Sequence, residues 1–274
     1  MKAQFSKIDT MKFDANHKQQ KWTLIYLRDL LRELIWRDIK LRYKRSLLGI
    51  VWSLLNPLMQ LIVLSLIFRI VLPLDIPNYN TFLFTGLLVW TWFQTSLFTA
   101  TGAIVDNREL IRRPGFPAAI LPVVTVATNF IHFLLALPIL LVFLLISGIP
   151  FSEAMLALPL LFVVQFLFTL SLVYFIATLH VRFRDTQYLL GIALLLGFYL
   201  SPIFYEASVI PQQYQLLYRL NPMVTLIEAY RSILIQGEFP IFLNLLLLSL
   251  VSLILLWVGY RLFKYGRAQF VEEL

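Results

Sequence analysis

Six apolar stretches alternate with short polar segments along the chain. A helix of about 20 apolar residues crosses the hydrocarbon core of a bilayer, which is about 30 Å thick. Long unbroken apolar runs are typical of membrane helices rather than of the alternating strands of a barrel. We therefore expect an all-α, polytopic membrane protein with six transmembrane helices. The expected spans cover residues 47–72, 81–105, 118–147, 151–179, 187–200 and 240–260.

An amphipathic stretch precedes the first span. Apolar residues recur there at helical spacing while basic residues cover the other faces, a pattern typical of a helix in the membrane interface. Glu33 and Arg37 are four residues apart, as are Asp38 and Arg42, in the acid-to-base order that favours ion pairs on a helix. We interpret residues 1–46 as a cytoplasmic tail and an N-terminal amphipathic interface helix, and residues 47–274 as the transmembrane domain. The alternative is an amphipathic helix of a soluble core. The apolar stripe consists of Leu27, Leu30, Leu31, Leu34, Ile35 and Ile39.

The segment 106–117, DNRELIRRPGFP, is the most informative polar loop. Its first residues can open a short helix, which Pro114 and Gly115 then end. Its size suits a rigid knob held by a cytoplasmic partner, whereas the alternative is a connector whose arginines only set the topology. The candidate contact residues are Asn107, Arg108, Glu109, Leu110, Arg112 and Arg113.

The segment 201–237 is too polar for a span and too apolar for a free loop. We expect one or two short interfacial or re-entrant helices here, on the extracellular side, because irregular backbone at that depth needs protein or a wet cavity around it. Glu228 and Arg231 are three residues apart, which places them on one helical face and favours an ion pair.

Composition and charge agree with a membrane protein. Hydrophobic residues make up 59% of the chain, the mean hydropathy is +0.79, and charged residues make up 14%, against roughly 25% in soluble domains. The net charge is +8, and 20 of the 23 Lys and Arg residues lie in segments 1–46, 106–117, 180–186 and 261–274. Because cytoplasmic loops of membrane proteins are enriched in Lys and Arg, this placement puts both termini in the cytoplasm and indicates membrane topology, not a nucleic-acid partner.

Few residues are suited to catalysis. There is no cysteine, which excludes disulfides and thiolate metal sites. The chain lacks HExxH, GxSxG and GxxxxGK[ST] patterns, so we expect neither an enzyme nor a metal or cofactor held by this chain. His132 is an ionisable residue deep in the third span, where it is either a proton relay or a packing histidine bonded to a neighbouring carbonyl.

Aromatic residues gather in two of the spans and in the segment that follows the fifth. Aromatic faces stack on sugar rings, so these residues are candidates for lining a channel for sugars. The alternative is ordinary packing, since aromatics are common at membrane interfaces. The candidates are Trp90, Trp92, Phe93, Phe198, Tyr199, Phe204 and Tyr205.

The run ELIWRDIKLRYKRSLLGIVWSLLNPLMQLIV, residues 33–63, resembles the N-terminal signature of membrane subunits of polysaccharide ATP-binding-cassette (ABC) exporters of type 2. These are the permeases for O-antigen, capsule and teichoic acid. NRELIRRPGFP (107–117) and Asn221-Pro222-Met223 followed by Tyr230-Arg231 are similar to two further stretches of that family, in the same order.

The resemblance implies a homodimer in the bacterial cytoplasmic (inner) membrane, paired with two copies of a separate ATP-binding-cassette subunit that binds ATP and Mg. The 106–117 segment would couple to that subunit, and the helices in 201–237 would cap the exit. The substrate would be a polysaccharide on undecaprenyl diphosphate. The basic residues of the interface helix would then attract the lipid diphosphate and anionic membrane lipids, although they also fit a purely topological role. They are Arg37, Lys40, Arg42, Lys44 and Arg45.

Three alternatives stay open at this point. Related ABC exporters carry teichoic acid, or drugs and small amphiphiles, on the same six spans. A passive channel or scaffold would have no energy source, so copurification of an ATPase subunit separates it from the exporters. A membrane-embedded glycosyltransferase needs clustered acidic residues near a cytoplasmic loop, and the chain lacks them.

Overall fold

The computed structural model describes residues 24–44 and 51–273, and in these ranges the chain is helical without strands. The all-α expectation is therefore confirmed for the described part of the chain. The elements are α1 (Leu24–Tyr43), α2 (Val51–Leu66), η1 (Ile67–Val71), α3 (Tyr79–Ala100), α4 (Gly102–Val105), α5 (Arg108–Ile111), α6 (Ile120–Ile146), η2 (Glu153–Ala157), α7 (Leu158–Arg182), α8 (Thr186–Leu200), η3 (Ala207–Val209), α9 (Gln212–Arg219), α10 (Pro222–Arg231), η4 (Ser232–Gln236) and α11 (Phe242–Glu273).

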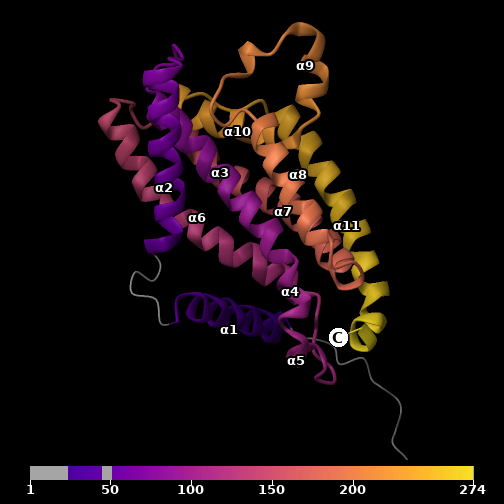
Figure 1. The fold of residues 1–274 in the computed structure, drawn as a ribbon. Coiled ribbons are helices and arrows are strands. Elements are labelled where there is room, and N and C mark those ends of the chain that lie inside the picture. The colour runs from indigo at the N-terminus through magenta and orange to yellow at the C-terminus, as the bar shows by residue number, and fades with distance from the viewer. Residues whose placement is uncertain (1–23, 45–50, 274) are drawn as a thin grey trace, which may run out of the picture.

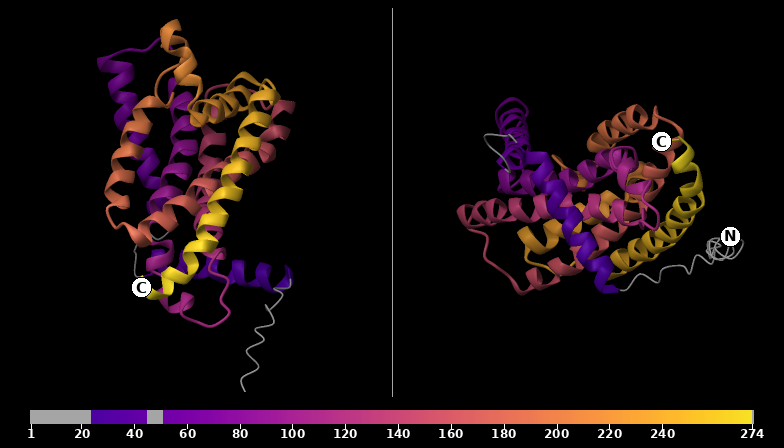
Figure 2. Two further views of the ribbon diagram at one scale, coloured as in Figure 1. Left: turned by 90° about the vertical axis from the view of Figure 1, so that its right-hand side faces the viewer. Right: turned by 90° about the horizontal axis from the view of Figure 1, so that it is seen from below.

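Helix α1 lies across one end of the helical bundle instead of joining it (Figure 1; Figure 2, right). The apolar stripe expected from the sequence explains this position. Leu34 is buried, its neighbours in the stripe pack against the core, and the helix lies on α6. The 106–117 segment and the C-terminal end of α11 lie at the same end of the molecule (Figure 1).

Helix α3 is the central element of the bundle. It contacts α2, α6, α7, α8 and α10, and most of its side chains are buried. Its small and hydroxylated residues allow this enclosure, because Thr85, Thr95 and Thr99 donate their hydroxyl protons to carbonyls of their own helix. A polar side chain satisfied in this way can be surrounded by apolar neighbours at little cost.

Within residues 24–44 and 51–273, four helical segments are long and apolar enough to cross a membrane. Helix α3 is not among them because its Thr, Trp, Tyr and Gln residues lower its hydropathy, and α8 is short, with 15 residues. The expected number of six spans therefore depends on the role of α3 and α8. The four segments are Leu54–Val71, Ile120–Ile146, Glu153–Arg182 and Phe242–Gly266.

Two expected loop boundaries were wrong. The segment 180–186 was expected to be a loop, yet α7 continues to Arg182, and the expected C-terminal tail 261–274 is helical to Glu273. Charged residues end a membrane span, but they do not end a helix, and in α7 the basic His180 and Arg182 in the last turn are favourable for the helix dipole. Helix α11 has 32 residues and is therefore about 48 Å long, well beyond a bilayer core of about 30 Å.

The opposite end of the bundle carries η3, α9, α10 and η4 (Figure 1). Short helices form in 201–237, as expected, while their interfacial or re-entrant position on the extracellular side stays a prediction. Helix α10 is packed into the bundle with most of its side chains buried, whereas α9 buries none and exposes Leu216 and Leu217, with Leu220 exposed just after it. Asn221 caps α10 by accepting a hydrogen bond from the backbone N–H of Met223. Pro222 occupies the first turn, where the backbone N–H that proline lacks would have no partner within the helix.

Candidate coupling and substrate-entrance site

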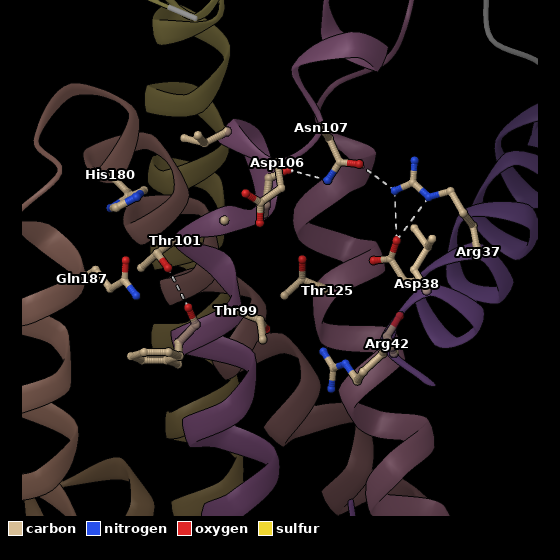
Figure 3. A pocket seen from close by; sticks show the side chains of 16 residues that line it. Arg37, Asp38, Arg42, Thr99, Thr101, Asp106, Asn107, Thr125, His180 and Gln187 are labelled. Carbon is tan, nitrogen blue, oxygen red and sulfur yellow. Dashed lines mark hydrogen bonds and ion pairs between the residues drawn. The ribbon is translucent and has the colours of Figure 1, made fainter. Parts of the chain in front are cut away.

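A polar cavity of about 610 Å³ lies beside α1, where the bundle meets the 106–117 segment. Its lining comes from α1, α3, α4 and α6, and from the junction between α7 and α8 (Figure 3). The lining is unusually polar for a largely apolar bundle. Its charged and polar side chains are Arg37, Asp38, Arg42, Thr99, Thr101, Asp106, Asn107, Thr125, Thr128, His180 and Gln187.

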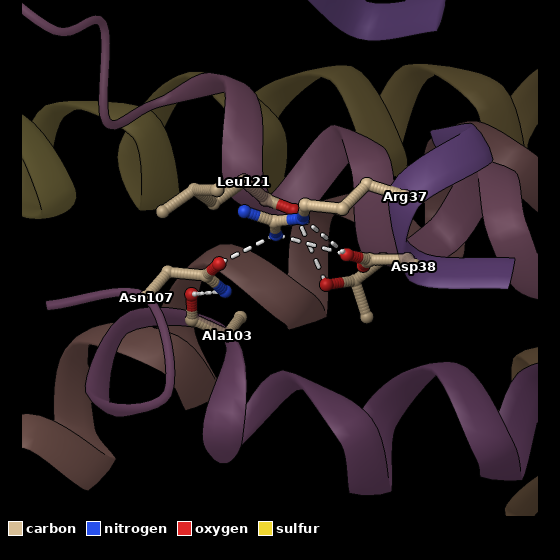
Figure 4. Close-up of polar contacts among 6 residues, drawn as sticks. Arg37, Asp38, Ala103, Asn107 and Leu121 are labelled. Carbon is tan, nitrogen blue, oxygen red and sulfur yellow. Dashed lines mark hydrogen bonds and ion pairs between the residues drawn. The ribbon is translucent and has the colours of Figure 1, made fainter. Parts of the chain in front are cut away.

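Arg37 connects α1 to the 106–117 segment at the edge of this cavity. Its Nη2 donates a hydrogen bond to Asn107 Oδ1 at 2.6 Å and a second to Asp38 Oδ1 at 2.9 Å. Asn107 is itself fixed, because its Nδ2 donates to the carbonyl of Ala103 in α4 at 3.1 Å (Figure 4). The side chains of Arg37 and Asp38 are about one-third exposed, at 33% and 31%.

The expected ion pairs along α1 were wrong in their partners. Arg37 pairs with the adjacent Asp38 rather than with Glu33, and Arg42 donates to Asn129 of α6 at 3.2 Å rather than pairing with Asp38. Spacing of four residues brings side chains together on an isolated helix. Here α1 lies against the bundle, so the arginines turn toward acceptors on other helices.

The 106–117 segment folds as the sequence indicates. Asn107 precedes the short helix α5, and its carbonyl accepts from the N–H groups of Leu110 and Ile111. Beyond the helix, Gly115 has a positive φ of 81°, which glycine adopts without strain. Four of the six candidate contact residues, Arg108, Glu109, Arg112 and Arg113, are exposed at the tip, while Leu110 is partly buried and Asn107 is bound to Arg37.

A second cavity of about 360 Å³ lies between α1, α2, α3 and α6, and Arg42 lines both cavities. Arg42 is held there by the buried Asn129, whose Nδ2 also donates to Thr99 at 3.1 Å. Sequence reasoning did not single out Asn129. The available signal was a polar side chain within the apolar run 118–147, three residues before His132.

His132 lines this second cavity as well. Its imidazole lies 3.3 Å from the hydroxyl of Tyr43, and the two rings meet edge to face. The expected partner, a neighbouring carbonyl, is thus replaced by the phenol of α1. His132 therefore fixes the C-terminal end of α1 to α6.

The five basic candidates divide into groups. The partly buried Arg37 and the exposed Arg42 line the cavities, whereas Lys40 and Lys44, which are also exposed, line neither of them. Arg45 lies outside the described residues. Among the four candidates that the structure describes, two therefore line the cavities.

The aromatic candidates occupy two different environments. Trp90, Trp92 and Phe93 are buried in α3, where Trp92 packs on Phe130 and Phe133 of α6. The other four form a continuous ring cluster at the end of α8 and in the segment after it: Phe198, Tyr199, Phe204 and Tyr205. Tyr199 is the most exposed of the four, at 58%.

We had expected an ion pair between Glu228 and Arg231, but the structure does not contain it. Glu228 is exposed, whereas Arg231 is 6% exposed and donates from Nη2 to the carbonyls of Ile203 at 2.8 Å and Phe82 at 3.3 Å. Its guanidinium carbon lies 3.3 Å from the centroid of the Phe82 ring. Burial lowers the pKa of Arg231, and these carbonyl and cation–π contacts favour its charged form.

The described residues form a helical bundle with several helices long and apolar enough to cross a membrane, which is the architecture of a polytopic membrane protein. Comparison with known proteins identifies its family: residues 29–235 match the ABC-2 type transporter family, to which this chain belongs.

Relatives with assigned names cover nearly the whole chain. The chain is 37% identical over 253 residues to the O-antigen export system permease protein RfbA of Myxococcus xanthus. The aligned region covers 92% of this chain and 97% of the relative. It is 32% identical to a protein of the same name from Klebsiella pneumoniae, over 93% of this chain and 99% of the relative. It is also 26% identical to the polysialic acid transport protein KpsM of Escherichia coli, over 84% and 91%.

Proposed function

We propose that this protein is the transmembrane subunit of an ATP-driven exporter that moves an undecaprenyl-diphosphate-linked polysaccharide outward. The observation that carries the proposal is the near full-length similarity to two permeases named for O-antigen export. A relative named for polysialic acid transport supports the broader substrate class, a polysaccharide. ATP and Mg are bound by a partner ABC subunit.

The proposed arrangement is a homodimer in the bacterial inner membrane with six spans in each chain. In this arrangement α3 and α8 cross the membrane in addition to the four long apolar segments. The basic segments 1–46, 106–117, 180–186 and 261–274 then face the cytoplasm, together with both termini. The opposite end, with α9 and α10, faces outward.

The 106–117 segment is the proposed contact for two copies of the ATPase subunit. Its exposed charges at a protruding tip support this role. We expect Glu109→Arg combined with Arg113→Glu to prevent copurification of the ATPase subunit and to abolish export. Glu153→Arg, an exposed charge reversal at the other end of the bundle, is the matched control. Normal copurification and export in the double variant would reduce the segment to a connector.

The substrate entrance is proposed at the two cavities beside α1. Arg42 supports this role because it lines both cavities and a guanidinium can bind phosphate through paired hydrogen bonds. We expect Arg42→Glu with Lys44→Glu to cut glycan export while membrane insertion stays normal. Arg28→Glu, on the exposed face of the same helix, should export normally. Unchanged export in the double variant would contradict the entrance role.

The proposed glycan path follows the ring cluster at the end of α8. Tyr199 is the side chain best placed to meet a sugar, because it belongs to that cluster and remains exposed. Trp92 and Phe93, by contrast, already pack on rings of neighbouring helices.

Depletion of the protein tests the overall proposal. We expect lipid-linked glycan to accumulate on the cytoplasmic side of the membrane and to disappear from the cell surface. Normal surface glycan combined with altered sensitivity to amphiphilic compounds would instead identify an exporter of small amphiphiles.

A further inference from the structure

Helix α1 carries two Arg–Asp pairs that are alike in sequence but differ in surroundings. Arg28 contacts Asp29 at 2.9 Å, and Arg37 contacts Asp38 at the same distance. The first pair is exposed, with side chains 75% and 59% accessible, whereas the second is about half as accessible, at 33% and 31%. Arg37 also reaches a residue 70 positions away, Asn107, at 2.6 Å.

Asp38 and Ala103 hold the two ends of this contact in place. Asp38 Oδ1 accepts from both Nε and Nη2 of Arg37, which fixes the plane of the guanidinium. On the other side, the carbonyl of Ala103 holds the amide of Asn107 so that its oxygen faces Arg37 (Figure 4). A charged donor and a pre-oriented acceptor make a stronger hydrogen bond than two neutral groups do.

The bond joins two elements whose other attachments differ. The apolar stripe of α1 packs on α6, whereas α4, which leads into the 106–117 segment, contacts α3, α6 and α7. Arg37 and Asn107 both line the cavity of about 610 Å³ (Figure 3). A shift of α5 that carries Asn107 with it therefore pulls on α1 through a side chain in the wall of that cavity.

We propose that Arg37 and Asn107 are a positioning pair that transmits movement of the 106–117 segment to α1, and that this movement changes the opening of the cavity beside α1. The proposal rests on the proposed function, in which the ATPase subunit acts on that segment. Asp38 keeps the guanidinium directed at Asn107. ATP hydrolysis is then linked to the position of the interface helix by one polar contact.

The first test separates coupling from assembly. Arg37→Met and Asn107→Leu each remove the bond, and we expect both to lower the glycan exported per ATP hydrolysed by about tenfold, the order of magnitude of one charge-assisted hydrogen bond. Copurification of the ATPase subunit and its ATP hydrolysis should persist. Asn107→Asp, which keeps the acceptor oxygen, should retain most of the export. Arg28→Met is the matched control and should behave as the wild type. Export per ATP in Arg37→Met and Asn107→Leu equal to that of Arg28→Met would overturn the proposal.

The second test restores the link covalently and uses the absence of cysteine in this chain. Arg37→Cys combined with Asn107→Cys should be uncoupled, and a short flexible bis-maleimide between the two thiols should recover at least half of the lost export. The assay uses the full complex, assembled from an ATPase subunit whose own thiols have been blocked. Export that stays low after complete cross-linking would overturn the proposal, since α1 would then follow the segment without restoring export.

Failure of the proposed function gives a different pattern from failure of this inference. If Glu109→Arg with Arg113→Glu leaves ATPase binding and export intact, the segment does not receive the ATPase subunit, and both proposals fall. If that variant loses ATPase binding while Arg37→Met and Asn107→Leu export normally, only the positioning pair is refuted.

Discussion

Arg231 is a charged side chain that the fold buries almost completely. Its two carbonyl acceptors, Ile203 and Phe82, belong to a loop and to α3, so one guanidinium ties α10 to two other segments. We expect Arg231→Met to lower the free energy of unfolding by about 1–3 kcal/mol, because the carbonyl of Ile203 loses its donor in a buried site. The midpoint of thermal denaturation in detergent measures this effect. Arg219→Met, an exposed change on α9, should leave the midpoint unchanged, and equal midpoints for the two variants would refute the role of Arg231.

Gly86 makes room for this arrangement. A Cβ at Gly86 would lie 2.9 Å from the carbonyl oxygen of Ile203 and 3.0 Å from Nη2 of Arg231. Backbone cannot easily retreat, so we expect Gly86→Ala to destabilise the protein by about 1–3 kcal/mol despite the better helix propensity of alanine. Gly191→Ala in α8, where nothing lies within 4 Å, is the control and should be neutral or stabilising. A Gly86→Ala protein with the thermal midpoint of the Gly191→Ala protein would contradict this reading.

The interaction partners of individual side chains were the feature of the structure least predictable from the sequence. Sequence spacing suggested Glu228 for Arg231 and Glu33 for Arg37, but the observed partners are a loop carbonyl and a distant asparagine. Helical spacing states which side chains can meet on one helix. It cannot state which outside acceptor a buried arginine will find, because that depends on how the helices pack. The polarity of 106–117 and the basic face of α1 were, however, visible in the sequence.

At the scale of the helices, α3 and α7 are joined by one polar side chain. Gln165 is fully buried, and its Nε2 donates to the carbonyl of Val89 at 2.9 Å, while its Oε1 has no hydrogen-bond partner among the residues that the structure describes. Interhelical hydrogen bonds in membranes contribute about 0.6 kcal/mol on average. We therefore expect Gln165→Leu to change the free energy of unfolding by less than about 1 kcal/mol, since the lost bond is offset by removal of an unpaired oxygen.

Gln165→Ala distinguishes packing from hydrogen bonding at the same position. It should lower the free energy of unfolding by about 2 kcal/mol or more, because it leaves a cavity between two helices. Thermal denaturation in detergent compares the two variants. Equal losses in both would mean that the hydrogen bond, and not the volume of the side chain, holds the helices together.

Element boundaries were predictable to within a few residues where apolar runs were long. The third span was expected at 118–147 and α6 covers Ile120–Ile146, because a continuous apolar run between a Pro-rich start and Gly148 leaves little choice. The predicted ends were wrong where a helix continues beyond its apolar run. Helix α7 and helix α11 continue into charged sequence, since a helix needs only its backbone hydrogen bonds while a span also needs apolar side chains.

At the scale of the whole molecule, the orientation in the membrane remains a prediction that the cysteine-free sequence makes easy to check. We expect Leu217→Cys on the exposed α9 to react with a membrane-impermeant maleimide added outside the cell. Lys264→Cys, toward the C-terminal end of α11, should react only after the membrane is permeabilised. The opposite pattern would reverse the topology deduced from the distribution of Lys and Arg.

The enclosure of α3 also has a consequence for biogenesis. In the six-span arrangement, this helix is made early, yet its Thr and Trp residues make it less apolar than the four long segments, so it gains less from insertion into lipid than they do. Among the long helices that contact it, α2 alone precedes it, while α6, α7, α8 and α10 are still to be translated. The nascent chain therefore has to shelter α3 beside α2 and the insertion machinery until the later helices arrive, and the first half of this permease cannot complete its membrane assembly without the second.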